Sequence, residues 1–407
     1  MYYLIKYANL YVEKYTNGKL LLDFTVESEF IFFRNNGDYT ENMKLWQYEP
    51  TMLYFRNINN LRIAEGDIVT ISMQALINHK EKTNKLYFDN TEENEKTYNI
   101  FMSFNDGSWL EELFRTGDAI KNNRLRKHII DNIVGTWPNG TPCSLNNISD
   151  QIKVEVVDVT QGSANLIHSN HSSTIFDFGA SIFASKFELS NIVDDVAENL
   201  GDFQNTSLII SHWDSDHYNL LTVLDEHWLQ QLCCVFFPSE VITLTAKQVV
   251  GRLLNNCRHI RTFKSPSAKK RGSVGIVSVI STPKYTLYVG EKSKDTNKSG
   301  LALAVKSSRD ITIFGADHTN KQIWEYIYPH ITAKYYNKLN VVVPHHGGSC
   351  GKINLICLSC NPGIAAISVG KNTYKHPNQA TIDSYDKLKF DVRRTDWERG
   401  NILIEMK

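Results

Sequence analysis

Residues 206–217 read TSLIISHWDSDH, in which a short apolar run leads directly into a cluster of side chains that can bind metal. His212, Asp214, Asp216 and His217 fall within six positions, so a tight loop can turn them toward shared cations. Imidazole and carboxylate ligands together suit Zn²⁺ or Mn²⁺. A solvated polar loop is the alternative interpretation, because short motifs also arise by chance.

Other strand-like runs end in residues of the same kind. Asp177 lies at the end of TIFDFG, Asp317 follows ITIFGA, and the His345–His346 pair follows NVVVP. Side chains placed directly after buried strands are aimed by a rigid scaffold. Five of the 13 histidines lie in these loops, namely His212, His217, His318, His345 and His346. This concentration favours a metal centre over a solvated loop.

The pattern of residue types changes near residue 150, which predicts a domain boundary there. Residues 151–407 alternate β-branched runs with helical patterns at 187–200 and 378–388, which predicts an α/β domain. Residues 1–150 are predicted to be a β-rich N-terminal domain, with turns in 32–40 and 64–76 and helical spacing over 109–134. Residues 135–150 gather Gly, Pro, Asn and Ser and are typical of a linker. Partner or substrate binding is one role for residues 1–150, although an ordinary β-core explains their aromatic residues more simply.

Six motifs in residues 151–407 resemble those of the metallo-β-lactamase fold, and more narrowly the hydrolase domain of ComEC-type DNA-uptake proteins. They occur in the family's order. They are Asp158-Val-Thr-Gln-Gly-Ser163, Asp177-Phe-Gly179, the run Ser211 to His217, Gly315-Ala-Asp317, Pro344-His-His-Gly-Gly348, and Ser368-Val-Gly-Lys-Asn372-Thr-Tyr374-Lys-His376-Pro377. The departures are Thr160, Ser163, Phe178, Gly348, Lys375 and the extra residue in Gly315-Ala-Asp317, and none of them removes a candidate ligand. The resemblance implies an αββα four-layer sandwich and an active enzyme, without the family's membrane channel.

The resemblance also implies a site. It assigns two divalent ions, Mn²⁺ or Zn²⁺, with Mn²⁺ favoured because Asp214 stands where many relatives have His. Asp216 would also orient the attacking water, His346 would contact phosphate, and His376 would act on the substrate side with Asn372 and Tyr374. Asp177 and His318 would hold ligands in place without touching metal. The implied ligands are His212, Asp214, Asp216, His217, Asp317 and one of His345 and His346, with His345 favoured because it directly follows Val-Pro.

A basic run indicates the substrate. Residues 257–272 contain no acid, in a chain whose 44 basic and 44 acidic side chains cancel. Such clusters neutralise backbone phosphates, although a solvated loop explains the run equally well. The sequence therefore predicts a phosphodiesterase, with DNA as the leading substrate. The alternatives are a hydrolase of a small molecule, such as a cyclic nucleotide, and an effector subunit of a defence complex. The basic side chains are Arg258, Arg261, Lys264, Lys269, Lys270 and Arg271.

Composition narrows the class of protein. Hydrophobic residues make up 42% of the 407 positions and charged residues 22%, which excludes a wholly disordered chain, a collagen and a coiled coil. No apolar run reaches the roughly 18 residues that a membrane span needs, and the N-terminus lacks the features of a signal peptide. Seven cysteines are few and odd in number. We therefore expect a reduced, cytoplasmic protein that does not act at a membrane.

Overall fold

The computed structural model describes most of the second half of the chain and parts of the first. Contacts between residues divide the chain into two compact units. One holds Met1–Gly135 with Ser185–Glu188 and Glu240–Arg252, and the other holds Thr136–Ala184, Leu189–Ser239 and Leu253–Lys407. The boundary near residue 150 stays a prediction, because residues 122–150 lie outside the description. The described residues are 7–16, 18–24, 51–58, 61–64, 66–72, 75, 86–87, 100–104, 108–116, 119–121, 151–170, 172–182, 184, 186–200, 205–241, 243–257, 259–268, 274–293, 295–331, 336–351, 353, 358–370 and 376–407.

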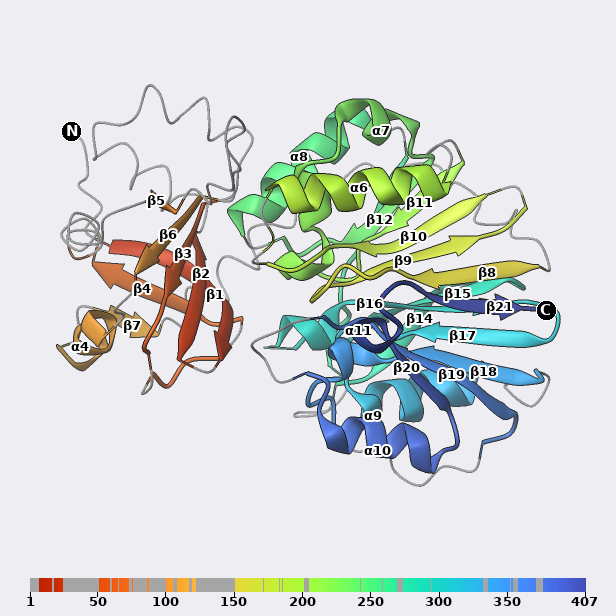
Figure 1. Cartoon of the computed structure of the whole chain (residues 1–407). Coiled ribbons are helices and arrows are strands. Elements are labelled where there is room, and N and C mark those ends of the chain that lie inside the picture. Colours follow the sequence, from red (N-terminus) through yellow and green to blue (C-terminus); the bar gives the residue numbers. More distant parts are fainter. Residues whose placement is uncertain are drawn as a thin grey trace. The chain divides into compact units, whose positions relative to one another are not determined.

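The N-terminal unit contains one seven-stranded sheet and is therefore rich in β-strands (Figure 1). Gly18 has φ +74° in the turn between the first two strands, a left-handed conformation that glycine adopts freely. Helix α4 (Ser108–Thr116) brings the Trp109 ring to 5.5 Å from that of Phe55. In spatial order the strands are β5 (Leu86–Tyr87), β6 (Ile100–Phe104), β3 (Thr51–Phe55), β2 (Lys19–Phe24), β1 (Tyr7–Thr16), β4 (Ile68–Ser72) and β7 (Ala119–Lys121).

The helical spacing predicted over 109–134 is confirmed over 109–116 and is wrong over 119–121. The helix ends at Thr116, and Ala119 and Ile120 belong to β7, where they pair with β4. Gly117 and Asp118 in the sequence are residues that favour a helix end. The remainder of that segment, residues 122–134, the turn predicted at 32–40 and the linker at 135–150 lie outside the described residues.

The second unit contains two more seven-stranded sheets. The first mixes an antiparallel half with four parallel strands, β10 to β13, and the second does the same with β17 to β20. The first runs β13 (Ile260–Phe263), β12 (Cys234–Pro238), β11 (Thr206–Ile209), β10 (Ser173–Phe178), β9 (Ala164–His168), β8 (Ile152–Val156), β21 (Ile402–Met406). The second runs β14 (Ile276–Ser281), β15 (Tyr285–Gly290), β16 (Leu301–Lys306), β17 (Asp310–Phe314), β18 (Lys338–Val342), β19 (Asn361–Ile367), β20 (Asp391–Arg394).

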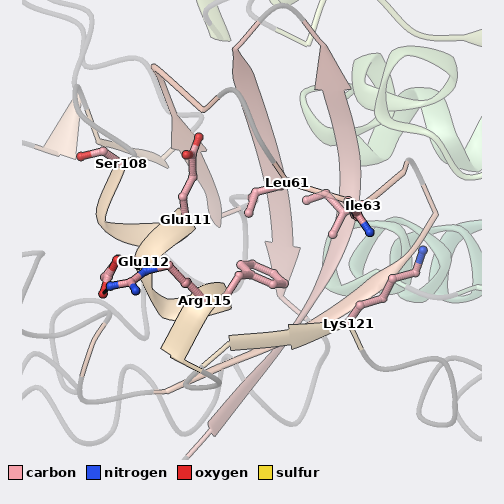
Figure 2. A pocket seen from close by; sticks show the side chains of 9 residues that line it. Leu61, Ile63, Ser108, Glu111, Glu112, Arg115 and Lys121 are labelled. Carbon is pink, nitrogen blue, oxygen red and sulfur yellow. Dashed lines mark hydrogen bonds and ion pairs between the residues drawn. The ribbon is translucent and has the colours of Figure 1, made fainter.

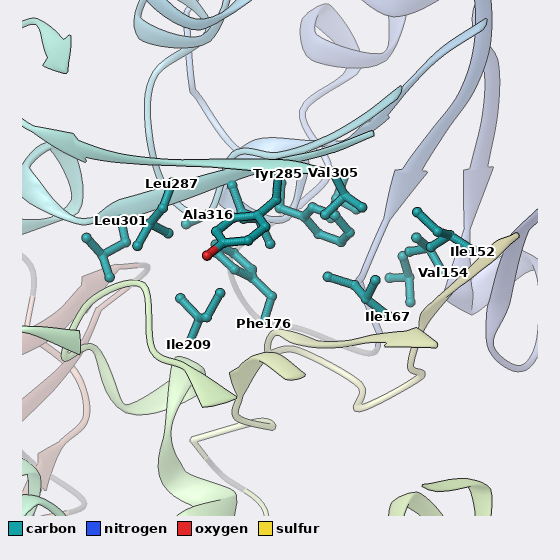
Figure 3. Packing of buried hydrophobic residues seen from close by; sticks show 14 of the residues in the cluster. Ile152, Val154, Ile167, Phe176, Ile209, Tyr285, Leu287, Leu301, Val305 and Ala316 are labelled. Carbon is teal, nitrogen blue, oxygen red and sulfur yellow. The ribbon is translucent and has the colours of Figure 1, made fainter. Parts of the chain in front are cut away.

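The inner faces of these two sheets share one apolar core (Figure 3). Along β21, Ile402, Ile404 and Met406 are buried, whereas Leu403 and Glu405 between them are exposed. This alternation is the period of two that a strand with one buried face must show. Phe176 of one sheet meets Phe314 of the other with ring centroids 5.5 Å apart. Burying each such side chain contributes about 1.5–3 kcal/mol, so the sandwich is a stable scaffold for the loops at its edge.

Helices form the two outer layers. Trp324 and Tyr385 pack against the outer face of the second sheet in a separate apolar cluster with Ile313 and Val341. Figure 1 shows α6 and α7 on the other side of the two sheets. The predicted αββα four-layer sandwich is therefore confirmed. The described helices and helical turns of residues 151–407, whichever unit they belong to, are α6 (Lys186–Leu200), η2 (Ser215–His217), η3 (Asn219–Thr222), α7 (Glu226–Gln231), α8 (Leu244–Asn256), η4 (Thr296–Ser299), α9 (Asn320–Gln322), η5 (Ile323–Ile327), η6 (Tyr328–His330), η8 (Pro344–Gly347), α10 (Gln379–Lys387) and α11 (Thr395–Glu398).

The strands predicted from the runs around β8 to β12 and β17 to β19 are all present, as are helices α6 and α10. The structure also contains the antiparallel strands β14 to β16 and the helices α7 and α8, which the sequence analysis does not predict. Among the described residues, no helix combines the length and the apolar character that crossing a membrane requires.

Candidate metal centre

The candidate ligands lie where parallel strands of both sheets end. The loop 211–217 follows β11, Asp317 follows β17, and the histidine pair follows β18. The carboxyl ends of parallel strands in one sheet meet at one edge, which is where α/β proteins build their sites. Gly179 permits the tight approach of two loops, because a Cβ atom there would collide with the backbone of Asp216 and His217. The sandwich thus brings together residues that are spread over positions 211–346 of the sequence.

Asp177 is the anchor of the loop 211–217. It is fully buried and has φ +60°, a strained backbone conformation for a residue other than glycine. Its carboxylate accepts from Ser211 N at 2.7 Å, Ser211 Oγ at 2.9 Å, His217 Nδ1 at 2.8 Å and Ser163 Oγ at 3.2 Å. Four donors on one carboxylate leave the loop with little freedom, so Asp177 orients His217 and the start of the loop.

Three histidine side chains direct their Nε2 atoms toward one region. His217 Nδ1 donates to Asp177, His346 Nδ1 lies 3.1 Å from the Ser368 carbonyl oxygen, and His212 Nδ1 lies 2.9 Å from Ser211 Oγ. A proton on Nδ1 leaves the Nε2 lone pair available for a metal, which is how protein partners fix histidine ligands. The Nε2 atoms of all three histidines are buried and make no hydrogen bond of acceptable geometry. Asp317 Oδ1 is buried as well and also lacks such a hydrogen bond.

These atoms form two candidate metal groups. His212, His217 and Asp317 make one group, with Asp317 Oδ1 3.2 Å from His217 Nε2. Asp216, His217 and His346 make the other, and the ligand atoms of each group lie within 4.8 Å of one another. Buried polar atoms normally have partners, so such a concentration of unsatisfied atoms fits bound cations. Asp214 is also buried, with Oδ2 3.6 Å from His212 Nε2.

The two adjacent histidines of η8 have different surroundings. Both have left-handed backbones, with φ +54° at His345 and +50° at His346. His345 is partly exposed and its Nδ1 donates to Asp317 Oδ2 at 2.7 Å. His346 is buried, with Nε2 3.4 Å from Asp216 Oδ2. The structure thus places His346, and not His345, in a candidate metal group, while the role of His345 as a ligand stays a prediction.

Burial and neighbouring charges shift the pKa values of the site. Burial alone would lower the pKa of His217, but the carboxylates of Asp317 and Asp177 raise it well above its usual value. Burial would raise the pKa of Asp317, but His345 and His217 hold it well below its usual value. His318 is fully buried beside Asp317, and burial with the nearby His212 lowers its pKa to about 4. Without metal, therefore, the Asp317 carboxylate and the His217 imidazole favour their charged forms, and His318 is neutral.

His376 lies beside this centre. Its ring is 5.5 Å from that of His345. Gly348 between them has no room for a side chain, because a Cβ atom would lie 2.6 Å from both His345 Cδ2 and His376 Nδ1. The absence of a side chain at Gly348 therefore allows the two rings to lie this close together. Asn372 and Tyr374, which the sequence predicts beside His376, lie outside the described residues.

The described part of the basic run is small. Arg261 lies in β13 with its guanidinium 5.2 Å from the Phe263 ring centroid, and Lys264 follows at an exposed position. The other four basic residues predicted to bind substrate, Arg258, Lys269, Lys270 and Arg271, lie outside the described residues. A cationic surface along this run stays a prediction.

Some residues of the site are not predicted from the sequence. Ser163 and Ser368 hold Asp177 and His346, and Asn297 Nδ2 donates to Asp317 Oδ2 at 3.3 Å. Ser163 and Ser368 lie in two of the six motifs quoted above, so those motifs could have indicated that the two residues belong to the site. Asn297 lies in η4 outside every motif, and nothing in its local sequence indicates a role.

The N-terminal unit carries a cavity of its own, with a volume of about 630 Å³ (Figure 2). Its wall combines apolar and charged side chains. Arg115 is paired with Glu112, and Lys121 Nζ lies 2.6 Å from Asp67 Oδ2. These ion pairs neutralise much of the charge, so the cavity identifies no ligand, and partner binding by residues 1–150 stays a prediction. The lining residues are Leu61, Arg62, Ile63, Ser108, Glu111, Glu112, Phe114, Arg115 and Lys121.

Comparisons with known proteins give structural similarity alone. No protein-family model and no curated protein matches the chain. The metallo-β-lactamase fold protein YhfI from Bacillus subtilis is 13% identical, with a TM-score of 0.36, over 63% of this chain and 99% of that one. Zn²⁺-bound PqqB from Methylobacterium extorquens is 8% identical, with a TM-score of 0.36, over 62% and 99%. The short form of human tRNase Z is 8% identical, with a TM-score of 0.29, over 46% and 76%. The fold assignment rests on the sheets and helices described above, and these proteins are what the chain is similar to.

Proposed function

We propose that this protein is a metal-dependent phosphodiesterase and that its substrate is DNA. One observation carries the proposal: three histidine Nε2 atoms and Asp317 Oδ1 are buried at one sheet edge without hydrogen-bond partners of acceptable geometry. A folded protein rarely tolerates such atoms unless a ligand satisfies them. The order of six motifs, which resembles ComEC-type hydrolase domains, supports hydrolysis of a phosphodiester.

The residues fit two divalent cations. His212 and Asp317 would hold one, with Asp214 close to it, Asp216 and His346 would hold the other, and His217 would serve one of the two through its single free Nε2. Mixed imidazole and carboxylate ligands are compatible with Mn²⁺ or Zn²⁺. Bound cations of this kind supply Lewis acidity toward phosphoryl oxygens and lower the pKa of water.

The chain's own residues then have separate tasks. Asp177 holds the His217 ring through Nδ1, and Ser368 holds the His346 ring in the same way. His345 holds the Asp317 carboxylate through Oδ2. Asp216 would accept a proton from the attacking water at a carboxylate oxygen. His376, whose ring lies 5.5 Å from that of His345, would donate to a phosphate oxygen or to the leaving group.

A phosphodiester backbone would be guided by the basic run of residues 257–272, which includes β13. Arg261 and Lys264 are its described members. Each phosphate neutralised by such side chains makes affinity fall with salt. A DNA substrate therefore predicts strongly salt-dependent binding, whereas a small substrate such as a cyclic nucleotide predicts a weak dependence.

The test is hydrolysis by purified protein loaded with Mn²⁺ or Zn²⁺. Single-stranded DNA, double-stranded DNA, RNA and cyclic nucleotides are incubated with wild type, with Asp216→Asn, and with Asp194→Asn as a matched control at an exposed position of α6. We expect cleavage of DNA by wild type and the control, and a loss of about 100-fold or more in Asp216→Asn. Hydrolysis of cyclic nucleotides alone would replace the DNA assignment. Equal inactivity of wild type and Asp216→Asn on every substrate would overturn the proposed function.

A further inference from the structure

Helix α11 begins at the same sheet edge as the candidate metal centre. Strands β17, β18, β19 and β20 are mutually parallel, so their carboxyl ends share one edge. β18 leads to His346, β19 to Ser368 and β20 to α11. Neighbouring strands are about 4.8 Å apart, which places the start of α11 roughly 10 Å from the end of β18.

Hydrogen bonds tie α11 to the residues that orient His346. Thr395 Oγ1 donates to the Val369 carbonyl at 2.7 Å and accepts from Val369 N at 2.9 Å. The preceding residue, Ser368, accepts from His346 Nδ1 at 3.1 Å. Thr395 is fully buried, so the helix is fixed relative to the centre.

This short helix displays a large aromatic side chain to solvent. Trp397 is 62% exposed, and the Arg394 guanidinium lies 4.1 Å from its ring centroid. Asp396 holds that guanidinium with two bonds, from Nε at 2.9 Å and from Nη2 at 2.5 Å. Because Arg394 covers one face of the indole, its exposed surface is the opposite face and the ring edges. An indole immobilised in this way loses little entropy when a second flat group stacks on it.

The charges around Trp397 select the kind of ligand. Three cations, Arg393, Arg394 and Arg399, are balanced by three acids, Asp391, Asp396 and Glu398. Arg393 pairs with Asp391 at 2.8 Å, as Arg394 does with Asp396. A neutral patch gives little attraction to phosphate. Its free aromatic face instead suits a flat, uncharged ring, such as the unpaired base of a nucleic acid strand.

We propose that Trp397, backed by Arg394, is a stacking subsite for an unpaired base of a single-stranded DNA substrate. The inference rests on the proposed function and deepens it, because it names the form of the substrate. A strand whose scissile phosphate lies at the metal centre would place a base a few nucleotides away on the indole. Recognition would be independent of sequence, since every base has a stacking face.

The test compares a fluorescently labelled DNA strand of about ten nucleotides with an abasic strand of equal length. Binding is measured by anisotropy in the presence of a chelator, which prevents hydrolysis. We expect Trp397→Ala to bind the normal strand about 5- to 100-fold more weakly than wild type does and the abasic strand equally well. Trp397→Phe keeps a ring and should stay within about threefold of wild type. Leu403→Ala removes an exposed apolar side chain from β21 and should bind as wild type does.

The loss should also be independent of salt, because a base contact releases no counterions. Circular dichroism of each variant establishes that the fold is retained. Equal binding of both strands by wild type, or an equal loss on both strands in Trp397→Ala, would overturn the stacking subsite. So would a wild type that binds neither strand, or that prefers a duplex over the single strand. Failure of DNA cleavage with a base-specific loss in Trp397→Ala would instead overturn the proposed function and leave the subsite standing.

Discussion

Nδ1 of His217 lies 2.8 Å from Oδ2 of Asp177, a residue 40 positions earlier in the chain. This hydrogen bond directs Nε2 of His217 toward Asp317, 3.2 Å away. The same carboxylate also accepts from Ser211, where the loop 211–217 begins. A single buried acid therefore determines both the course of the loop and the direction in which its last histidine points.

Replacing Asp177 by Asn should weaken metal binding more than it changes the fold. The amide keeps the shape and tolerates the left-handed backbone, but its NH₂ group faces donors that it cannot accept from. We expect metal affinity to fall about 10- to 100-fold and the free energy of unfolding by about 1–3 kcal/mol. Metal titration by calorimetry and denaturant unfolding measure the two effects. Unchanged metal affinity would show that Asp177 does not orient a ligand.

Variants of the two adjacent histidines should separate their roles. Because His346 Nε2 belongs to a candidate metal group, His346→Ala should lower metal affinity by about 10-fold or more. His345→Ala should cost less than about 10-fold, since His345 acts here through Asp317. Elemental analysis after dialysis gives the metal content of each variant. The reverse order would identify His345 as the ligand, as the sequence predicts.

The stability of the metal-free protein should depend on pH through His318. Its pKa is about 4 in the folded chain and near 6.5 when unfolded, so between these values the unfolded chain binds more protons. Stability should therefore rise with pH by about 1.4 kcal/mol per unit over this window, about 3 kcal/mol in all, and be fully present above pH 6.5.

His318→Gln should flatten this dependence, and the exposed His330→Gln should not. Urea unfolding of the chelated protein at several pH values between 4 and 7 supplies the slopes. Parallel curves for wild type and His318→Gln would contradict the assignment of the slope to this residue.

Replacing Gly348 by Ser should displace His376. A Cβ atom would lie 2.6 Å from His376 Nδ1 and from His345 Cδ2, so at least one ring must move. Misplacement on this scale can cost about 10- to 100-fold in kcat/KM, with about 1–3 kcal/mol of overpacking strain. Gly251→Ser is the matched control, because a Cβ atom there meets nothing within 4 Å. Kinetics on the DNA substrate would distinguish the two, and wild-type activity in Gly348→Ser would show that His376 needs no such space.

The sequence predicts strands β8 to β12 and β17 to β19 of the second unit because each of them carries a run of apolar residues that the sheet and helix layers must bury. It predicts less of the first unit, where α4 ends at Thr116 and β7 begins at Ala119. Nor does it predict Asn297, whose contact with Asp317 joins η4 to the end of β17. Such contacts depend on the geometry of loops, and no local sequence pattern indicates that geometry.

The sequence by itself determined which residue types could bind cations and that they follow strands, because ligand chemistry and strand periodicity are local properties. Only the tertiary structure decided which side chains converge. His345 and His346 are adjacent and chemically identical, and their surroundings differ because two successive left-handed backbones send one ring to Asp317 and the other to Asp216 and Ser368. Likewise, Trp397 is one of seven tryptophans in the sequence, and only the parallel order of β18, β19 and β20 places the start of its helix at the same sheet edge as the centre.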